Sequence, residues 1–70
     1  MGLLGMMIGS TAKAMSRELR AIELNNTGME LYYAGNYSEA LRYFSQALVL
    51  MPLNETYRNN KQMCLDAMRY

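Results

Sequence analysis

The sequence has no histidine and only one cysteine, Cys64, among its 70 residues. A single cysteine excludes a disulfide within the chain, and structural zinc sites need several cysteine or histidine ligands. A serine or cysteine nucleophile would also lack the histidine that usually acts as its base. The six acidic residues are scattered singly, so no pair of carboxylates suggests acid–base catalysis or a metal site. We therefore expect a protein that is not an enzyme and that has no catalytic residue, metal or cofactor.

A strong charge of either sign is also missing, because seven basic and six acidic residues give a formal net charge of +1. A nucleic-acid-binding surface normally carries a clear positive excess, so we expect no nucleic acid partner. Tryptophan is absent and proline occurs once, whereas 51% of the residues are hydrophobic. This length and composition suit one small helical unit rather than two domains.

No long hydrophobic run opens the chain. The apolar stretch from Leu3 to Ile8 is far shorter than the ~20 residues that a membrane-spanning helix needs. We treat residues 1–10 as an apolar leader that packs on the next helix or on a partner. The lone Cys64 fits a reducing compartment, and we favour an intracellular, cytoplasmic protein.

The residues that follow the leader leave two alternatives open. No acid precedes Glu18, whereas Lys13, Arg17 and Arg20 are basic, and this acid-poor composition is typical of a mitochondrial transit peptide. The same three basic residues would align on a helix and could contact an anionic membrane. A mitochondrial location and membrane contact are therefore kept as alternatives that we do not favour.

The clearest pattern in the chain lies between residues 37 and 51, where apolar residues recur every three or four positions. This spacing places them on one face of a helix. They are Tyr37, Ala40, Leu41, Phe44, Ala47, Leu48 and Met51. Pro52 follows, and we expect it to end the helix because it lacks an N–H and clashes with the preceding turn.

An earlier helix is predicted from about Thr11 to Ala34, since neither glycine nor proline interrupts the chain between Thr11 and Thr27. Gly35 suits the left-handed residue that often ends a helix. Asn36 would then be the N-cap of the second helix, with Glu39 three residues later completing a capping box. These signals predict an antiparallel pair of helices near residues 22–34 and 37–51, followed by a third helix near 55–69 that Asn54 would cap.

Residues 21–54 resemble a tetratricopeptide repeat (TPR), a 34-residue helix–turn–helix unit. Gly28 and the Ala40-x₃-Phe44 spacing match the family pattern, and Pro52 closes the repeat without any insertion. The pattern implies a repeat core made of Leu24, Gly28, Leu31, Ala40, Phe44, Ala47 and Pro52. Leu24, Thr27 and Leu31 depart from the family residues, so we expect atypical packing of the first helix.

The resemblance implies an all-α fold, a TPR-like helical hairpin with an N-terminal helical extension and a C-terminal solvating helix. Residues 11–70 would form one domain, with the repeat at 21–54 and the capping helix at 55–69. The expected apolar side of that capping helix is Tyr57, Cys64, Leu65 and Met68.

In TPR proteins a second stripe of the first helix lines a groove that binds peptides. The equivalent residues here, and so the candidate partner-binding face, are Ile22, Asn25, Asn26, Met29, Tyr32 and Tyr33. Tyrosine is enriched at protein interfaces, and asparagine supplies amide donors and acceptors. The alternative is that these residues pack against the leader or another subunit.

We therefore expect a non-catalytic protein–protein interaction module that self-associates or acts as a small scaffold subunit of a larger complex. One repeat cannot bury both of its faces, because TPRs are stabilised by their neighbours. One alternative is a membrane-associated TPR adaptor that uses the leader with Lys13, Arg17 and Arg20. Another is a designed or truncated single repeat.

Overall fold

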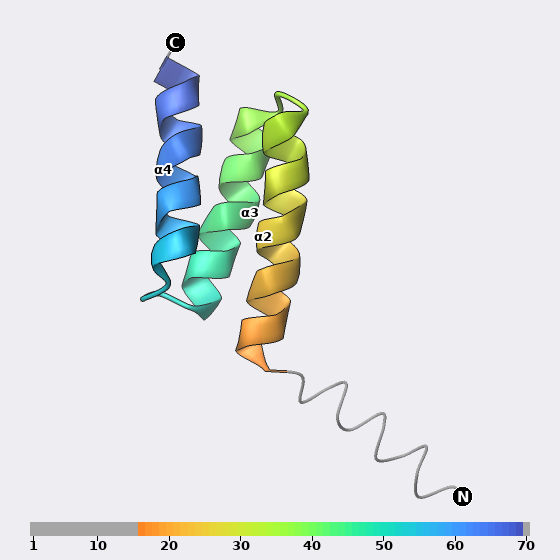
Figure 1. The fold of residues 1–70 in the computed structure, drawn as a ribbon, viewed down its shortest axis with the longest axis vertical. Coiled ribbons are helices and arrows are strands. Elements are labelled where there is room, and N and C mark those ends of the chain that lie inside the picture. Colours follow the sequence, from red (N-terminus) through yellow and green to blue (C-terminus); the bar gives the residue numbers. More distant parts are fainter. Residues whose placement is uncertain (1–15, 70) are drawn as a thin grey trace, which may run out of the picture.

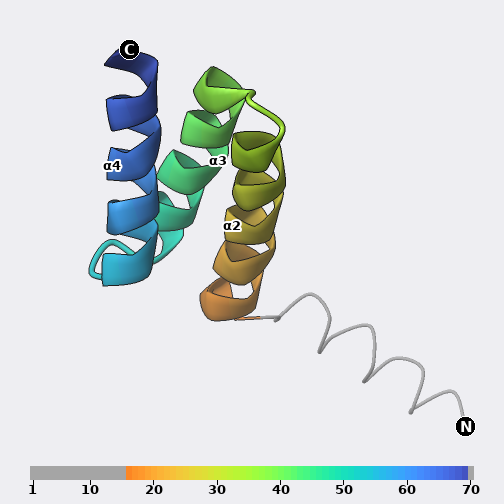
Figure 2. The same cartoon turned by 45° about the horizontal axis from the view of Figure 1, so that its top comes forward.

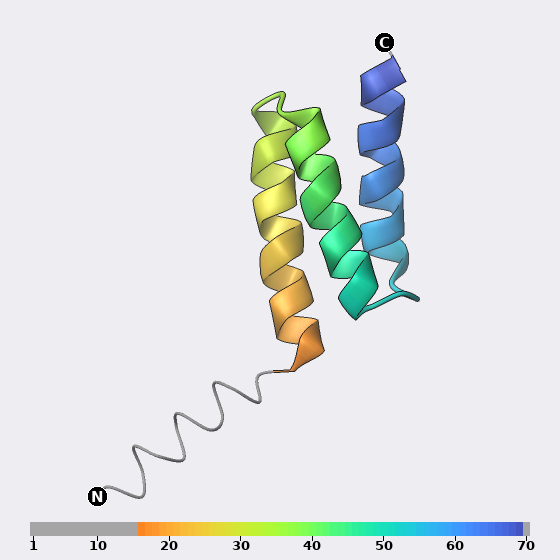
Figure 3. The same ribbon diagram turned by 180° about the vertical axis from the view of Figure 1, so that it is seen from behind.

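The computed structural model describes residues 16–69, which form three α-helices (Figure 1). Helix α2 spans Arg17–Tyr33, α3 spans Tyr37–Leu50 and α4 spans Glu55–Arg69. Consecutive helices run antiparallel, and α3 lies between α2 and α4 when the molecule is tilted or seen from behind (Figure 2 and Figure 3). The described residues contain no strand, and the predicted all-α fold is confirmed.

Helix α2 starts later than predicted. Ser16 has an extended backbone (φ −62°, ψ 157°), and its hydroxyl oxygen accepts a hydrogen bond of 3.3 Å from the Leu19 N–H. The prediction of one uninterrupted helix from Thr11 to Ala34 is wrong, because Ser16 acts as an N-cap and turns the chain out of the helix. The leader and Lys13 lie outside the described residues.

The connection between α2 and α3 is a Schellman motif. Gly35 has a φ of 86°, as predicted, and its N–H donates to the Tyr32 carbonyl at 3.0 Å. The Asn36 N–H donates to the Leu31 carbonyl at 2.8 Å. The predicted capping box is not formed: the side chain of Asn36 makes no capping hydrogen bond, and the backbone N–H that Glu39 would have bound is already taken by Leu31.

The connection between α3 and α4 follows the sequence signals closely. Helix α3 ends at Leu50, before Pro52. The Asn54 side-chain oxygen accepts a hydrogen bond of 3.0 Å from the Tyr57 N–H, so the predicted N-cap of α4 is confirmed.

Two clusters of buried side chains hold the helices together. Ala21, Ala47 and Tyr57 form one, and each of the three helices contributes a residue. Ala40, Phe44 and Cys64 form the other, with Met29, Leu31, Tyr32 and Leu41 packed around it. Leu24 is half-buried against the first cluster, whereas Pro52 lies exposed and ends α3 rather than filling the core.

Helix α4 covers one side of the hairpin with a narrower apolar side than predicted. Tyr57 and Cys64 are buried, but Leu65 is 37% and Met68 is 47% exposed. Leu65 lies about 100° around the helix from Cys64, which turns it away from α3. The last turn of α4 extends past the start of α3, which leaves Met68 with less cover (Figure 1 and Figure 3).

Candidate partner-binding face

The six predicted face residues divide into a covered and an open set. Asn25, Met29 and Tyr32 are half-buried, and Met29 and Tyr32 pack on the cluster around Phe44. Asn26 is exposed, Ile22 is 48% exposed and Tyr33 is 77% exposed. The stripe therefore has one edge against the core and one edge in solvent, and we call these six residues the α2 face.

Helix α4 meets the α2 face through a pair of amides. The side-chain N–H of Asn60 donates to the side-chain oxygen of Asn25 at 2.8 Å. This part-buried bond joins residues of α2 and α4 that are 35 positions apart in sequence, and it fixes the position of Asn25. Asn26, the next residue, has its amide free to meet solvent or a partner, since it is exposed.

Sequence reasoning missed the contribution of α4. Met63 and Ala67 are half-buried, and they follow Asn60 by three and seven positions, which places all three on one side of α4. The signal was present in this spacing, but it was hidden because the apolar side of α4 was assigned to Tyr57, Cys64, Leu65 and Met68. We add Asn60 to the candidate face.

Tyrosine rings gather at the turn end of the hairpin. The ring of Tyr32 contacts that of Tyr33 edge-on, with centroids 5.6 Å apart, and that of Tyr37 at 5.2 Å. Such aromatic pairs are worth about 0.5–1.5 kcal/mol beyond the area they bury. Tyr32 therefore holds the exposed Tyr33 ring in place without covering it.

The described residues offer little reactive chemistry. Cys64 is fully buried, and burial raises the pKa of its thiol, which keeps it protonated and a poor nucleophile. Within residues 16–69 no three histidine, cysteine, aspartate or glutamate side chains gather as a metal site would require. None of the three described helices is long and apolar enough to cross a membrane.

The hairpin of α2 and α3 has the sequence signature of a known family. Residues 21–54 match the tetratricopeptide repeat family. These residues form a tetratricopeptide repeat. Tetratricopeptide repeats are generally non-catalytic, and the repeat supports a protein–protein interaction module in general terms.

Two plant proteins contain similar sequences. The chain is 38% identical over 47 residues to the inactive TPR repeat-containing thioredoxin TTL3 of Arabidopsis thaliana. The matched stretch is 67% of this chain and 7% of that protein. It is 33% identical over 60 residues to the TPR repeat-containing thioredoxin TTL4 of the same plant. This second match is 86% of this chain and 9% of that protein. The chain thus spans less than a tenth of either relative. No solved structure gives a significant match.

Proposed function

We propose that this chain is a non-catalytic interaction module that binds an extended, uncharged segment of a partner protein on the α2 face and the adjacent Asn60. The observation that carries the proposal is the composition of this surface. It combines amide groups, aromatic rings and a methionine, and none of its residues is charged.

Each part of the surface suits a different part of such a ligand. The amide of Asn26 can hydrogen-bond a ligand backbone, which presents both donors and acceptors. Tyr33 and Ile22 offer exposed apolar area to ligand side chains. Met29 adapts its shape to what lies above it. Because Tyr32 and Asn25 are already held by Tyr37 and Asn60, little side-chain conformational entropy would be lost on binding.

The test is selection of binding peptides from a random display library, followed by affinity measurements with variants. Tyr33→Ala and Asn26→Ala change exposed residues of the surface, so both should fold normally. Truncating a tyrosine anchor usually weakens binding about tenfold or more. Val49→Ala is the matched control, because Val49 is equally exposed, at 77%, and lies on α3, which contributes nothing to the surface. If Val49→Ala weakened peptide binding as much as Tyr33→Ala does, the proposal would be refuted.

We further infer that the chain assembles with itself or with another subunit. Apolar side chains that are more than a third exposed occur on all three helices and the α3–α4 loop: Leu19, Ile22, Tyr33, Val49, Leu53, Leu65 and Met68. Stacking of TPRs buries surfaces of this kind.

Self-association is measured by molar mass from light scattering across micromolar dilutions, with the melting temperature followed in parallel. A self-associating chain shows a mass and a melting temperature that fall on dilution. A monomeric mass and a constant melting temperature would leave a foreign subunit as the partner and would exclude the homo-oligomer.

A further inference from the structure

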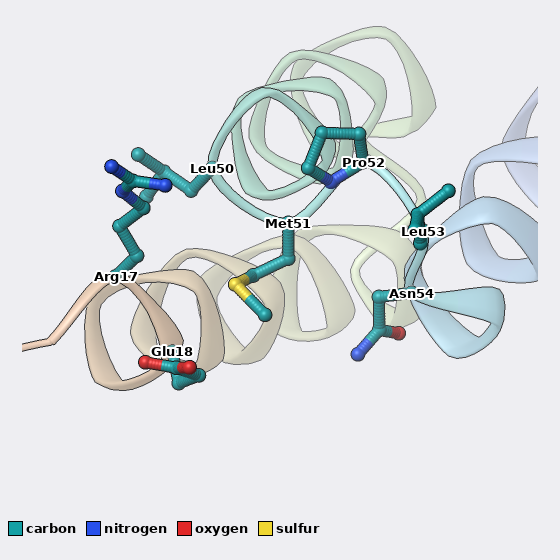
Figure 4. A pocket seen from close by; sticks show the side chains of 7 residues that line it. All are labelled: Arg17, Glu18, Leu50, Met51, Pro52, Leu53 and Asn54. Atoms are coloured by element: carbon teal, nitrogen blue, oxygen red, sulfur yellow. The ribbon is translucent and has the colours of Figure 1, made fainter.

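A pocket of about 600 Å³ opens where the end of α3 passes the first turn of α2 (Figure 4). Its lining consists of Arg17, Glu18, Leu50, Met51, Pro52, Leu53 and Asn54. The side chain of Met51 points from the end of α3 toward the first turns of α2 (Figure 4). Within residues 16–69 the pocket is poorly covered, since Leu53 is 90% exposed.

The lining is apolar along one continuous segment. Leu50, Met51, Pro52 and Leu53 follow one another, while Arg17 and Glu18 supply one charge of each sign at the α2 side. An occupant of this pocket therefore needs apolar side chains and no net charge. Its size falls in the range of about 300–1,000 Å³ that is typical of pockets for small ligands.

The chain itself carries a segment of this chemistry shortly before α2 in the sequence. Residues 3–8 are Leu-Leu-Gly-Met-Met-Ile, which have no charged side chain. The two methionines are unbranched and polarizable, which suits an irregular pocket. Gly5 lets the segment bend between its apolar side chains.

The connection between this segment and the pocket is short. Arg17, the first residue of α2, lines the pocket, so Ser16, the first described residue, directly precedes a residue of the lining. Residues 9–15 can span roughly 23 Å when extended, at about 3.3 Å per residue. A tether of this length holds the segment at an effective concentration in the millimolar range.

We propose that Leu3–Ile8 docks in the pocket of its own chain and covers Leu50, Met51 and Leu53. The leader is then an internal part of the fold at the end opposite the tyrosine cluster. The pocket shares no residue with the α2 face, so this docking is independent of the proposed binding of a partner segment on that face.

The experiment uses tryptophan fluorescence of the full chain, which contains no tryptophan of its own. Leu4→Trp places a single reporter inside the proposed docking segment. Docking moves the ring out of water, so its emission maximum should lie at shorter wavelength than that of the same chain in denaturant. The shift should be unchanged across micromolar dilutions, because the docking is within one molecule.

Two further substitutions locate the docked segment. Leu53→Asp, added to Leu4→Trp, puts a charge into the pocket and should return the emission to the wavelength of an exposed tryptophan. Val49→Asp is the matched control: Val49 is 77% exposed and does not line the pocket, so the shift should persist. Far-UV circular dichroism establishes that each variant keeps its helices, and Leu53→Gln replaces Leu53→Asp if the aspartate lowers the helix content.

Three results would overturn the proposal. A solvent-exposed emission in Leu4→Trp alone would show that the segment docks nowhere. A shift that fades on dilution would place the segment on a second copy of the chain. A shift that survives every folded Leu53 variant would place it on some other surface.

Discussion

A Cβ atom built on Gly28 would lie 2.6 Å from Cε1 and 2.8 Å from Cδ1 of Phe44. The backbone of α2 therefore rests directly on the ring of Phe44, the largest fully buried side chain of the described residues. Glycine inside a helix costs about 1 kcal/mol relative to alanine. The close approach of α2 to α3 explains why glycine stands there nevertheless.

Gly28→Ala should destabilise the protein. The added methyl group pushes the Phe44 ring aside or moves the two helices apart, which typically costs about 1–3 kcal/mol. Over most of that range the cost is larger than the gain in helix propensity. The measurement is the free energy of unfolding by denaturant. Gly35→Ala is the contrasting change, because Gly35 has a φ of 86° and a Cβ atom built on it would meet nothing within 4 Å. It should therefore cost about 1–2 kcal/mol through backbone strain alone.

Making both glycine substitutions in a Phe44→Leu variant separates the clash at Gly28 from the backbone strain at Gly35. A smaller side chain relieves the clash, so Gly28→Ala should cost less there than in the wild type, whereas the cost of Gly35→Ala should not change. Equal costs of Gly28→Ala in both backgrounds would show that the residues are not coupled.

Phe44→Ala should bring the chain close to unfolding. Truncating a buried phenylalanine costs about 3–5 kcal/mol, and the whole stability of a small domain is about 5 kcal/mol at the low end of the usual range. Thermal denaturation followed by circular dichroism measures the effect. Val49→Ala on the same helix is exposed and should stay within about 0.5 kcal/mol of the wild type. If the two variants melted within a few degrees of each other, Phe44 would not be the central side chain.

The hydrogen bond between Asn25 and Asn60 should couple α2 to α4. We expect Asn25→Ala and Asn60→Ala each to be destabilising, and the double variant to be less destabilising than the sum by about 0.5–1.5 kcal/mol. Chemical denaturation of the four chains of the cycle gives this coupling energy. Asn26→Ala, which removes an exposed neighbour, supplies the control cycle with Asn60→Ala and should show no coupling.

Local signals predicted most of this fold. Pro52, Gly35 and Asn54 act through the geometry of their own turn, so the bounds of α3 and α4 could be predicted from the sequence to within a residue. Ser16 misled the prediction, because a serine is compatible with both a helix interior and an N-cap. The choice was made by the hydroxyl bond to Leu19, which a propensity argument cannot weigh.

The candidate face was predictable only on the helix that carries the repeat signature. Asn25, Met29 and Tyr32 follow from helical spacing and the TPR resemblance. Their burial by Asn60 and the core depends on how α4 docks, and that is set by long-range packing of Tyr57 and Cys64. No pattern within α2 contains this information.

Burial of Cys64 in the cluster with Ala40 and Phe44 makes protein stability sensitive to alkaline pH. The folded state raises the pKa of this thiol above its ordinary value of 9.0, through loss of hydration of the thiolate. The folded chain therefore holds the thiol proton at pH values where the unfolded chain has released it. By linkage, the stabilising contribution is complete below the unfolded pKa and is lost as the pH rises through the folded one.

The free energy of unfolding should therefore fall more steeply above pH 9.0 in the wild type than in Cys64→Ala. The two chains differ only at residue 64, so the contributions that all other groups make to the pH dependence cancel in the comparison. Cys64→Ala also removes packing volume, but that loss is constant with pH and shifts the curve without changing its slope. Denaturant titrations from pH 7 to 10.5 give both curves. Curves that stay parallel over this whole range would mean that the thiol ionises equally well in the folded and unfolded chain, and that Cys64 is not sealed from water.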